Sequence, residues 1–163
     1  MRPGIREKHD GDLADRSSIR LWLRLLSCAT VMEKRLKRRL SDRFDSTLPR
    51  FDVLAALDRA PDGLTMGALS GALLVSNGNV TGVVQGLIRE GHVTLCPSPT
   101  DRRASIAQLT PGGAAHFATL ADAHHHWVEA MVAGMTREDR QALYTLLGAL
   151  KQSLAADSGE VDP

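Results

Sequence analysis

The stretch Leu64–Val93 reads LTMGALSGALLVSNGNVTGVVQGLIREGHV and decides the fold. Its first part predicts a short helix over 66–74, with Thr65 as the N-cap. Ser76 then begins a second helix, which ends at Gly91. The buried face of this second helix is an apolar stripe at helical spacing, made of Val80, Val83, Val84, Leu87 and Ile88. Two short helices joined by a tight turn predict a helix-turn-helix.

The residues that follow Gly91 change from helical periodicity to strand composition. Val93–Cys96 and Ser105–Leu109 each have the composition of a short strand. The polar segment Pro97–Ala104 lies between them and predicts the tip of a β-hairpin. A helix-turn-helix followed directly by a hairpin is the winged-helix arrangement. The sequence therefore predicts a mainly α-helical fold with a small β-hairpin wing.

Longer helices are predicted on both sides of this unit. Apolar residues recur at helical spacing over 17–44, and a short helix follows over 51–60. Thr110 is a cap that precedes proline at the first helical position, so a helix over about 111–133 begins there. Thr136 caps the last helix.

This pattern divides the chain into a winged lobe and its flanks. Residues 49–110 form the winged helix-turn-helix lobe, and 19–48 and 111–154 form the helical region around it. We expect residues 1–18 to be a flexible arm and residues 155–163 a flexible tail.

Composition limits the class of protein. Of the 163 residues, 43% are apolar and 24% are charged, which is typical of a globular domain. No apolar run approaches the ~18–20 residues of a membrane span, and residues 1–18 are too polar for a signal peptide. Cys28 and Cys96 lack the spacing of a disulfide framework. We therefore expect a cytoplasmic protein in a reducing compartment.

The charge is unevenly distributed, although the net charge is only +1. Residues 31–60 carry eight positive and five negative side chains, whereas residues 61–110 carry three of each. A nucleic-acid-binding domain usually has a strongly basic balance. If this chain binds DNA, compact local contacts must provide the affinity.

The second helix of the helix-turn-helix carries a polar face opposite its apolar stripe. Amides and hydroxyls dominate this face, which comprises Asn77, Asn79, Thr81, Gln85 and Arg89. Asn and Gln can pair with two adenine atoms at once in the major groove, and Thr can contact a thymine methyl group or a phosphate. A solvated helix face is the other interpretation of the pattern. The helix before it and the hairpin after it favour DNA recognition.

The hairpin tip carries Asp101, Arg102 and Arg103. Two guanidiniums on a thin projection can reach phosphates or enter a narrow minor groove, where the negative potential is greatest. Asp101 is suited to orient one of these arginines by a charge-assisted hydrogen bond. A solvated charged turn is the alternative.

Together with PTDRRASIAQLTPGG at 99–113, the stretch 64–93 resembles the multiple-antibiotic-resistance regulator (MarR) family of bacterial transcription factors. The resemblance covers about residues 19–154. Its most specific part is the Asp-x-Arg wing followed by the Leu-Thr-x-x-Gly helix start. It implies a winged-helix homodimer whose two lobes read a pseudo-palindromic operator. The first, fifth and sixth helices then pack together, so that 19–48 and 111–154 form the dimerisation region.

The resemblance also implies a regulatory function. Most members repress, and many release DNA when a small, often aromatic, acid binds between the lobes and the dimerisation region. The recognition helix is most similar to branches that control the breakdown of aromatic acids, some of which are sensed as coenzyme A thioesters. The implied partners are double-stranded DNA, a second copy of the chain and such an effector, with no cofactor.

Carried over residue by residue, the resemblance assigns the DNA contacts. Arg103 enters the minor groove and is held by Asp101, while Arg89 and Arg102 contact phosphates. Thr65, at the start of the preceding helix, joins the DNA-binding set. The groove contacts are Ser76, Asn77, Asn79, Thr81 and Gln85.

An anionic aromatic effector needs a concave apolar site with one or two cations. The first helix offers an aromatic ring, a guanidinium and a hydroxyl, and the second helix opens with a further guanidinium and ring. The candidate pocket residues are Trp22, Arg24, Ser27, Arg50 and Phe51. The alternative is that these arginines are solvated or pair across the dimer.

A dense basic run lies on the first helix. It consists of Lys34, Arg35, Lys37, Arg38, Arg39 and Arg43. Such a run could contact DNA in a salt-dependent, sequence-independent manner or attract coenzyme A phosphates. A solvated helix face with Glu33 and Asp42 as partners is the simpler interpretation.

Other classes of function find less support. The only tyrosine, Tyr144, is remote in sequence from Cys28, so we expect Cys28 to be an inert core cysteine and keep redox sensing as an alternative. His124, His125 and His126 point about 100° apart on a helix and cannot share one metal ion. No catalytic motif is recognisable, so the chain is not expected to be an enzyme. A winged-helix module for protein contacts is the remaining alternative.

Overall fold

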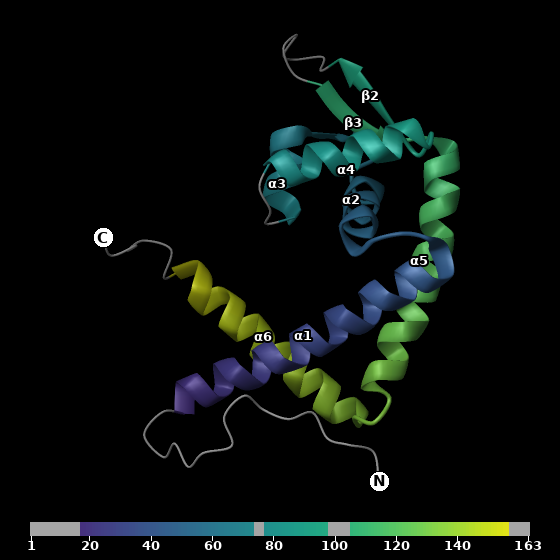
Figure 1. Cartoon of the computed structure of the whole chain (residues 1–163). Helices are drawn as coiled ribbons and strands as arrows, with labels where there is room; N and C mark the ends of the chain where they lie inside the picture. The colour runs from purple at the N-terminus through teal and green to yellow at the C-terminus, as the bar shows by residue number, and fades with distance from the viewer. Residues whose placement is uncertain (1–16, 74–76, 98–104, 157–163) are drawn as a thin grey trace. The chain divides into compact units, whose positions relative to one another are not determined.

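The computed structural model describes residues 17–73, 77–97 and 105–156, and within this part of the chain the fold is mostly helical (Figure 1). The side chains of residues 77–79 are outside the description. The elements, in chain order, are α1 (Ser17–Phe44), α2 (Leu48–Asp58), β1 (Leu64–Thr65), α3 (Met66–Leu73), α4 (Asn77–Arg89), β2 (Val93–Pro97), β3 (Ser105–Leu109), α5 (Pro111–Val132) and α6 (Arg137–Ala156). The predicted succession of helices and hairpin strands is confirmed.

Two element boundaries differ from the sequence prediction. The second helix begins at Leu48, three residues before the predicted start, because Pro49 fits the first turn after an extended Thr47. Leu64 and Thr65 form a short strand that the sequence analysis did not predict. Two residues are too few for any periodic signal.

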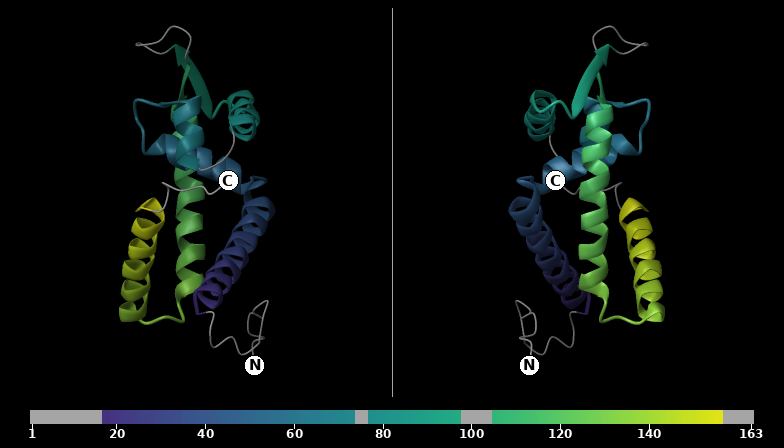
Figure 2. Two further views of the ribbon diagram at one scale, coloured as in Figure 1. Left: turned by 90° about the vertical axis from the view of Figure 1, so that its left-hand side faces the viewer. Right: turned by 90° about the vertical axis from the view of Figure 1, so that its right-hand side faces the viewer.

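The chain forms two compact units, one that ends at His124 and one that begins at His125. In the first unit, α2 packs against α3 and α4, while the strands contact α2, α3 and α4. Figures 1 and 2 show β2 and β3 extending beyond the helices of this unit.

A small antiparallel sheet connects the helix-turn-helix to the hairpin. The strand order is β1-β3-β2, with Leu64 opposite Ala107 and Val93 opposite Leu109. Gly63 precedes β1 with a φ of 80°, and a Cβ there would overlap β3. Glycine therefore permits both the left-handed turn and the close pairing of β1 with β3.

The core of the first unit lies where α1, α2, α3, α4 and α5 contribute fully buried leucines. These are Leu40, Leu54, Leu69, Leu87 and Leu120, each 0% exposed. Val80 and Val84 lie beside Leu87 on the buried face of α4. The predicted apolar stripe is thus confirmed as the inner face of that helix. Burial of this face is the main stabilisation that holds α4 in place.

Hydrogen bonds connect the turn after α4, residues 90–92, to the start of α5; this turn is called the corner below. Gly91 ends the α4 turn with a φ of 77°. The Thr110 hydroxyl donates to the Gly91 carbonyl over 2.7 Å, and the Thr110 amide donates to the His92 carbonyl over 3.0 Å. The Gly113 amide donates to Thr110 Oγ1 over 2.9 Å, which confirms Thr110 as the cap of α5.

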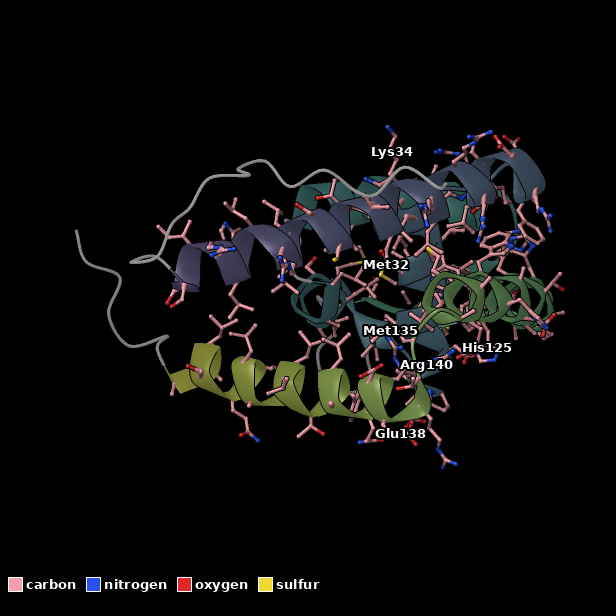
Figure 3. The ribbon with its side chains drawn as sticks, turned by 90° about the horizontal axis from the view of Figure 1, so that it is seen from below. Met32, Lys34, His125, Met135, Glu138 and Arg140 are labelled. Carbon is pink, nitrogen blue, oxygen red and sulfur yellow. The ribbon has the colours of Figure 1, made fainter. Side chains whose placement is uncertain are left out.

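The second unit contains the last part of α5 and all of α6. Thr136 Oγ1 accepts a hydrogen bond from the Asp139 amide over 3.1 Å, so the predicted cap of the last helix is confirmed. Arg140 Nη1 lies 2.9 Å from Glu129 Oε2 and joins α6 to the end of α5. Figure 3 shows Arg140 and Glu138 on different sides of α6.

Each unit exposes large apolar side chains on a helix. On α1, Trp22 is 57% exposed. On α6, none of the described residues is buried, and Leu146 is 67% exposed. In the described ranges, no helix combines the length and apolar character required to cross a membrane.

Candidate nucleic-acid interface

The outward face of α4 carries the polar side chains that the sequence analysis selected. Thr81, Gln85 and Arg89 are exposed, whereas Val80, Val84 and Leu87 on the opposite face are at most 2% exposed. A Cβ on Gly82 would meet nothing within 4 Å. The outward face of α4 is therefore polar, and at Gly82 no neighbouring side chain prevents another molecule from approaching the helix backbone.

The beginning of α4 is only partly described. Asn77 and Asn79 occupy positions in its first turn, but their side chains lie outside the described residues, as does Ser76. Thr65 is half-buried, and its hydroxyl accepts a hydrogen bond from the Ala68 amide over 3.2 Å. Thr65 thus caps α3 as predicted, and its contact with DNA stays a prediction.

The strands of the wing are described, but the tip is not. Strands β2 and β3 pair from Val93 opposite Leu109 to Pro97 opposite Ser105. Asp101, Arg102 and Arg103 lie outside the described residues, so their roles stay predictions. Pro97 and Ser105, the described residues on either side of 98–104, are the last pair of the hairpin.

An ion pair fastens the C-terminal end of α4. Arg50 Nη2, near the start of α2, contacts Glu90 Oε2, directly after α4. The hydrogen bond from Arg50 is the main reason why the pKa of Glu90 lies below its ordinary value. Arg50 is therefore occupied by a residue of the same chain.

The five candidate effector residues fall into two separate groups. Trp22, Arg24 and Ser27 lie near the start of α1, whereas Arg50 and Phe51 lie on α2. Arg24 precedes the end of α1 by 20 residues, which is about 30 Å of helix. One protomer does not bring the five side chains together.

Two of these residues are engaged within the protomer. The Ser27 hydroxyl donates to the Leu23 carbonyl over 2.7 Å. Phe51 is only 8% exposed, and its ring centroid lies 4.4 Å from that of His124 and 5.6 Å from that of Phe117. These contacts give Phe51 a packing role in the core.

A shallow cavity accompanies the exposed group on α1. Its volume is about 270 Å³, and the described residues that line it are Ser17, Arg20, Leu21 and Arg24. Two guanidiniums one helical turn apart could attract an anion here. The cavity keeps Arg24 as a candidate effector contact.

The basic run on α1 is partly paired with acidic neighbours. Lys37 Nζ lies 2.6 Å from Glu33 Oε1, and Arg38 Nε lies 3.4 Å from Asp42 Oδ2. Lys34 extends away from α1 (Figure 3). The predicted pairing with Glu33 and Asp42 is present, and such exposed pairs contribute at most about 1 kcal/mol to stability.

The expected burial of Cys28 is wrong, because this residue is exposed on α1. The buried residues of α1 are Leu36 and Leu40, which lie in the second half of the helix. Among the residues that the structure describes, no group of three or more His, Cys, Asp or Glu is placed to hold a metal ion.

Sequence reasoning missed the cluster around Arg50. Its members are Arg50, Glu90, His92 and His116, which come from three parts of the chain: α2, the turn after α4, and α5. Arg50 and Glu90 are 40 positions apart, so no local motif connects them. Only the packing of α2 against α4 brings them together.

The fold and this interface define a winged helix-turn-helix protein. The comparisons with known proteins show to which family of such proteins it is similar. Residues 44–104 match the MarR family. The transcriptional activatory protein BadR of Rhodopseudomonas palustris is 34% identical over 96 residues, which cover 58% of this chain and 54% of BadR. The matched region thus spans about half of the length of that relative.

Solved structures extend the likeness over most of the chain. A MarR family transcriptional regulator from Silicibacter pomeroyi is 33% identical, with a TM-score of 0.73, over 88% of this chain and 99% of that one. A mutant of Escherichia coli MarR complexed with operator DNA is 26% identical, with a TM-score of 0.74, over 86% and 99%. The chain belongs to the MarR family of transcriptional regulators. These relatives are regulators, which agrees with the expectation that the chain is not an enzyme.

Proposed function

We propose that this protein is a homodimeric transcriptional regulator that reads a pseudo-palindromic DNA operator with α4. The orientation of α4 carries the proposal: Val80, Val84 and Leu87 are buried, whereas Thr81 and Gln85 are exposed. This is the arrangement that a helix needs to enter a major groove. The complex of the E. coli relative with operator DNA supports it.

Each part of the lobe has a distinct role in this proposal. Thr81 and Gln85 read base edges, together with Ser76, Asn77 and Asn79. Arg89 and Arg102 contact phosphates and set the register of the protein on the duplex. Arg103, oriented by Asp101, enters the minor groove beside the site.

A homodimer would account for the exposed apolar surfaces. Trp22 on α1 and Leu146 on α6 belong to exposed apolar stripes, which single soluble domains rarely leave open. In the proposed dimer, α1, α5 and α6 pack against their copies. A two-fold symmetric protein then matches a two-fold symmetric operator.

The proposed regulator responds to a small aromatic carboxylate or its coenzyme A thioester. Arg24 would hold the carboxylate in the cavity that Arg20 and Leu21 also line. Trp22 is two residues from Arg24 on α1 and faces another direction, so it would supply an aromatic surface to this site only from another protomer. Arg50 and Phe51 would join this site only if another protomer supplied one of the two groups. We propose repression of a nearby promoter, relieved by the effector, although BadR is an activatory protein.

Selection from a random DNA pool about 30 base pairs long, three turns of duplex, tests the function without knowledge of the operator. We expect recovery of a pseudo-palindrome that binds with nanomolar affinity and competes far better than random duplex. Binding should weaken steeply as salt rises. Equal competition by random duplex would instead favour a protein-interaction module.

The double substitution Thr81→Ala with Gln85→Ala tests the assignment of the groove contacts. Specific affinity should fall by roughly 1–3 kcal/mol for each lost base contact, because the base edges lose their partners. Stability should change little, since both side chains are exposed. Fluorescence anisotropy with the selected duplex measures the affinity. Unchanged binding would exclude these residues from base readout.

Substitution Arg24→Ala tests the effector site. Operator affinity should be retained, since Arg24 is remote from α4 in the chain, whereas release by the effector should be blunted by about tenfold or more. A thermal-shift screen of phenolic acids and acyl-coenzyme A esters identifies the effector first. Thr30→Ala, an exposed position on the same helix, is the control. Normal release by Arg24→Ala would remove Arg24 from the site.

A further inference from the structure

Two histidines stack at the corner where α4 leads into β2. The rings of His92 and His116 lie with their centroids 4.2 Å apart and an interplanar angle of 6°. His92 directly precedes β2, and His116 lies on the second turn of α5. The two rings thus form a contact between the end of the helix-turn-helix and α5.

The stack adjoins the ion pair that fastens α4. His92 Nε2 lies 3.9 Å from Glu90 Oε2, and the same carboxylate oxygen contacts Arg50 Nη2. One carboxylate, Glu90, therefore faces one permanent cation and the two stacked imidazole rings. Protonation of His116 would add a positive charge close to the Arg50 guanidinium and against the ring of His92.

The backbone ties the same corner to α5 and leaves little room for adjustment. The Thr110 amide donates to the His92 carbonyl, and the first turn of α5 passes so close that a Cβ on Gly113 would overlap that carbonyl. The backbone of His92 is therefore held against the first turn of α5. Repulsion between the stacked rings acts directly on this contact between the corner and α5.

We propose that Arg50, Glu90, His92 and His116 form a proton-sensitive latch that holds the C-terminal end of α4. At neutral pH the stacked rings and the ion pair keep the recognition helix in position. Acidification places a positive charge on His116, which separates α5 from the corner and weakens DNA binding. The effect on DNA rests on the proposed function, whereas the loosening of the corner does not.

The direction of the pH dependence follows from the surroundings of His116. Burial, then the charges of His92 and Arg50, lower its pKa below the ordinary 6.5, while Glu90 acts in the opposite direction. A histidine whose pKa is lower in the folded state stabilises the fold above pH 6.5, and this stability is lost as the pH falls below that value. The pKa of Glu90 is lowered from 4.5, so its carboxylate stays charged throughout this range.

Operator affinity at about pH 7.5 and about pH 5.5, at constant ionic strength, tests the latch in the intact protein. The probe is the duplex selected from the random pool. We expect the wild type to lose roughly three- to tenfold in affinity on acidification. His116→Phe, which keeps a ring for stacking but cannot gain a proton, should lose far less. His125→Gln, an exposed position on the same helix, is the matched control and should behave like the wild type.

Amide hydrogen exchange of the wild type provides a second measurement that needs neither DNA nor a variant. After correction for the intrinsic rates, the amides of residues 86–92 should lose protection at the lower pH. Tight binding that does not change with pH would overturn the latch and leave the proposed function intact. Failure to select any duplex at neutral pH would overturn the proposed function, and hydrogen exchange would then decide the latch alone.

Discussion

Substitution Leu87→Ala is expected to lower the free energy of unfolding by about 2–5 kcal/mol. Leu87 is 0% exposed and lies on the buried face of α4, between α4 and the rest of the first unit. Removal of three side-chain carbons leaves a cavity that the neighbouring leucines and valines fill only in part. Equilibrium urea denaturation measures the change.

Gln85→Ala is the matched control for this prediction. Gln85 lies two residues away on the same helix but is exposed, so its replacement should change the free energy of unfolding by less than about 0.5 kcal/mol. The two substitutions thus separate the inner face of α4 from its outer face. Equal effects on stability would show that the helix does not present the faces described.

Substitution Gly113→Ala is expected to destabilise the protein by about 3 kcal/mol. Alanine favours a helix over glycine by up to about 1 kcal/mol, but its Cβ would overlap the backbone of His92. A carbonyl fixed by its hydrogen bond to Thr110 cannot rotate away as a side chain would. The cost of this overlap exceeds the gain in helix propensity. Thermal denaturation measures the resulting loss of stability.

The neighbouring glycine provides a direct comparison. Gly112 is exposed, and the nearest atom to a Cβ there is the Thr110 Oγ1 at 3.7 Å, which is an ordinary contact. Gly112→Ala should therefore leave stability unchanged or raise it by up to about 1 kcal/mol. Equal stability of Gly113→Ala and Gly112→Ala would show that α5 does not pass as close to the His92 backbone as described.

The sequence predicted the elements whose signals are local. The helical spacing of Val80, Val84 and Leu87, together with their apolar character, predicts the inner face of α4, and their burial confirms it. Thr110 and Thr136 were recognised as caps because a cap is determined by its immediate neighbours.

Local sequence signals could not predict features that depend on contacts between distant parts of the chain. The ion pair between Arg50 and Glu90 is one such feature, because it depends on the packing of α2 against α4. The exposure of Cys28 is another, because the sequence analysis predicts an inert core cysteine from the lack of an activating neighbour, whereas the structure exposes this residue on α1. Both outcomes depend on which helix face meets a partner, and one helix considered alone cannot specify that.

The middle position of β3 has a mechanical consequence. Because β3 pairs with both β1 and β2, the hairpin shares hydrogen bonds with the two residues that precede α3. Movement of the hairpin alone would have to break the pairing of Leu64 with Ala107 and of Thr65 with Ile106. In a dimer of such lobes, the strands of the hairpin and the recognition helix would therefore move together. The dimer would adapt to different spacings of the operator half-sites by tilting each lobe as a rigid body.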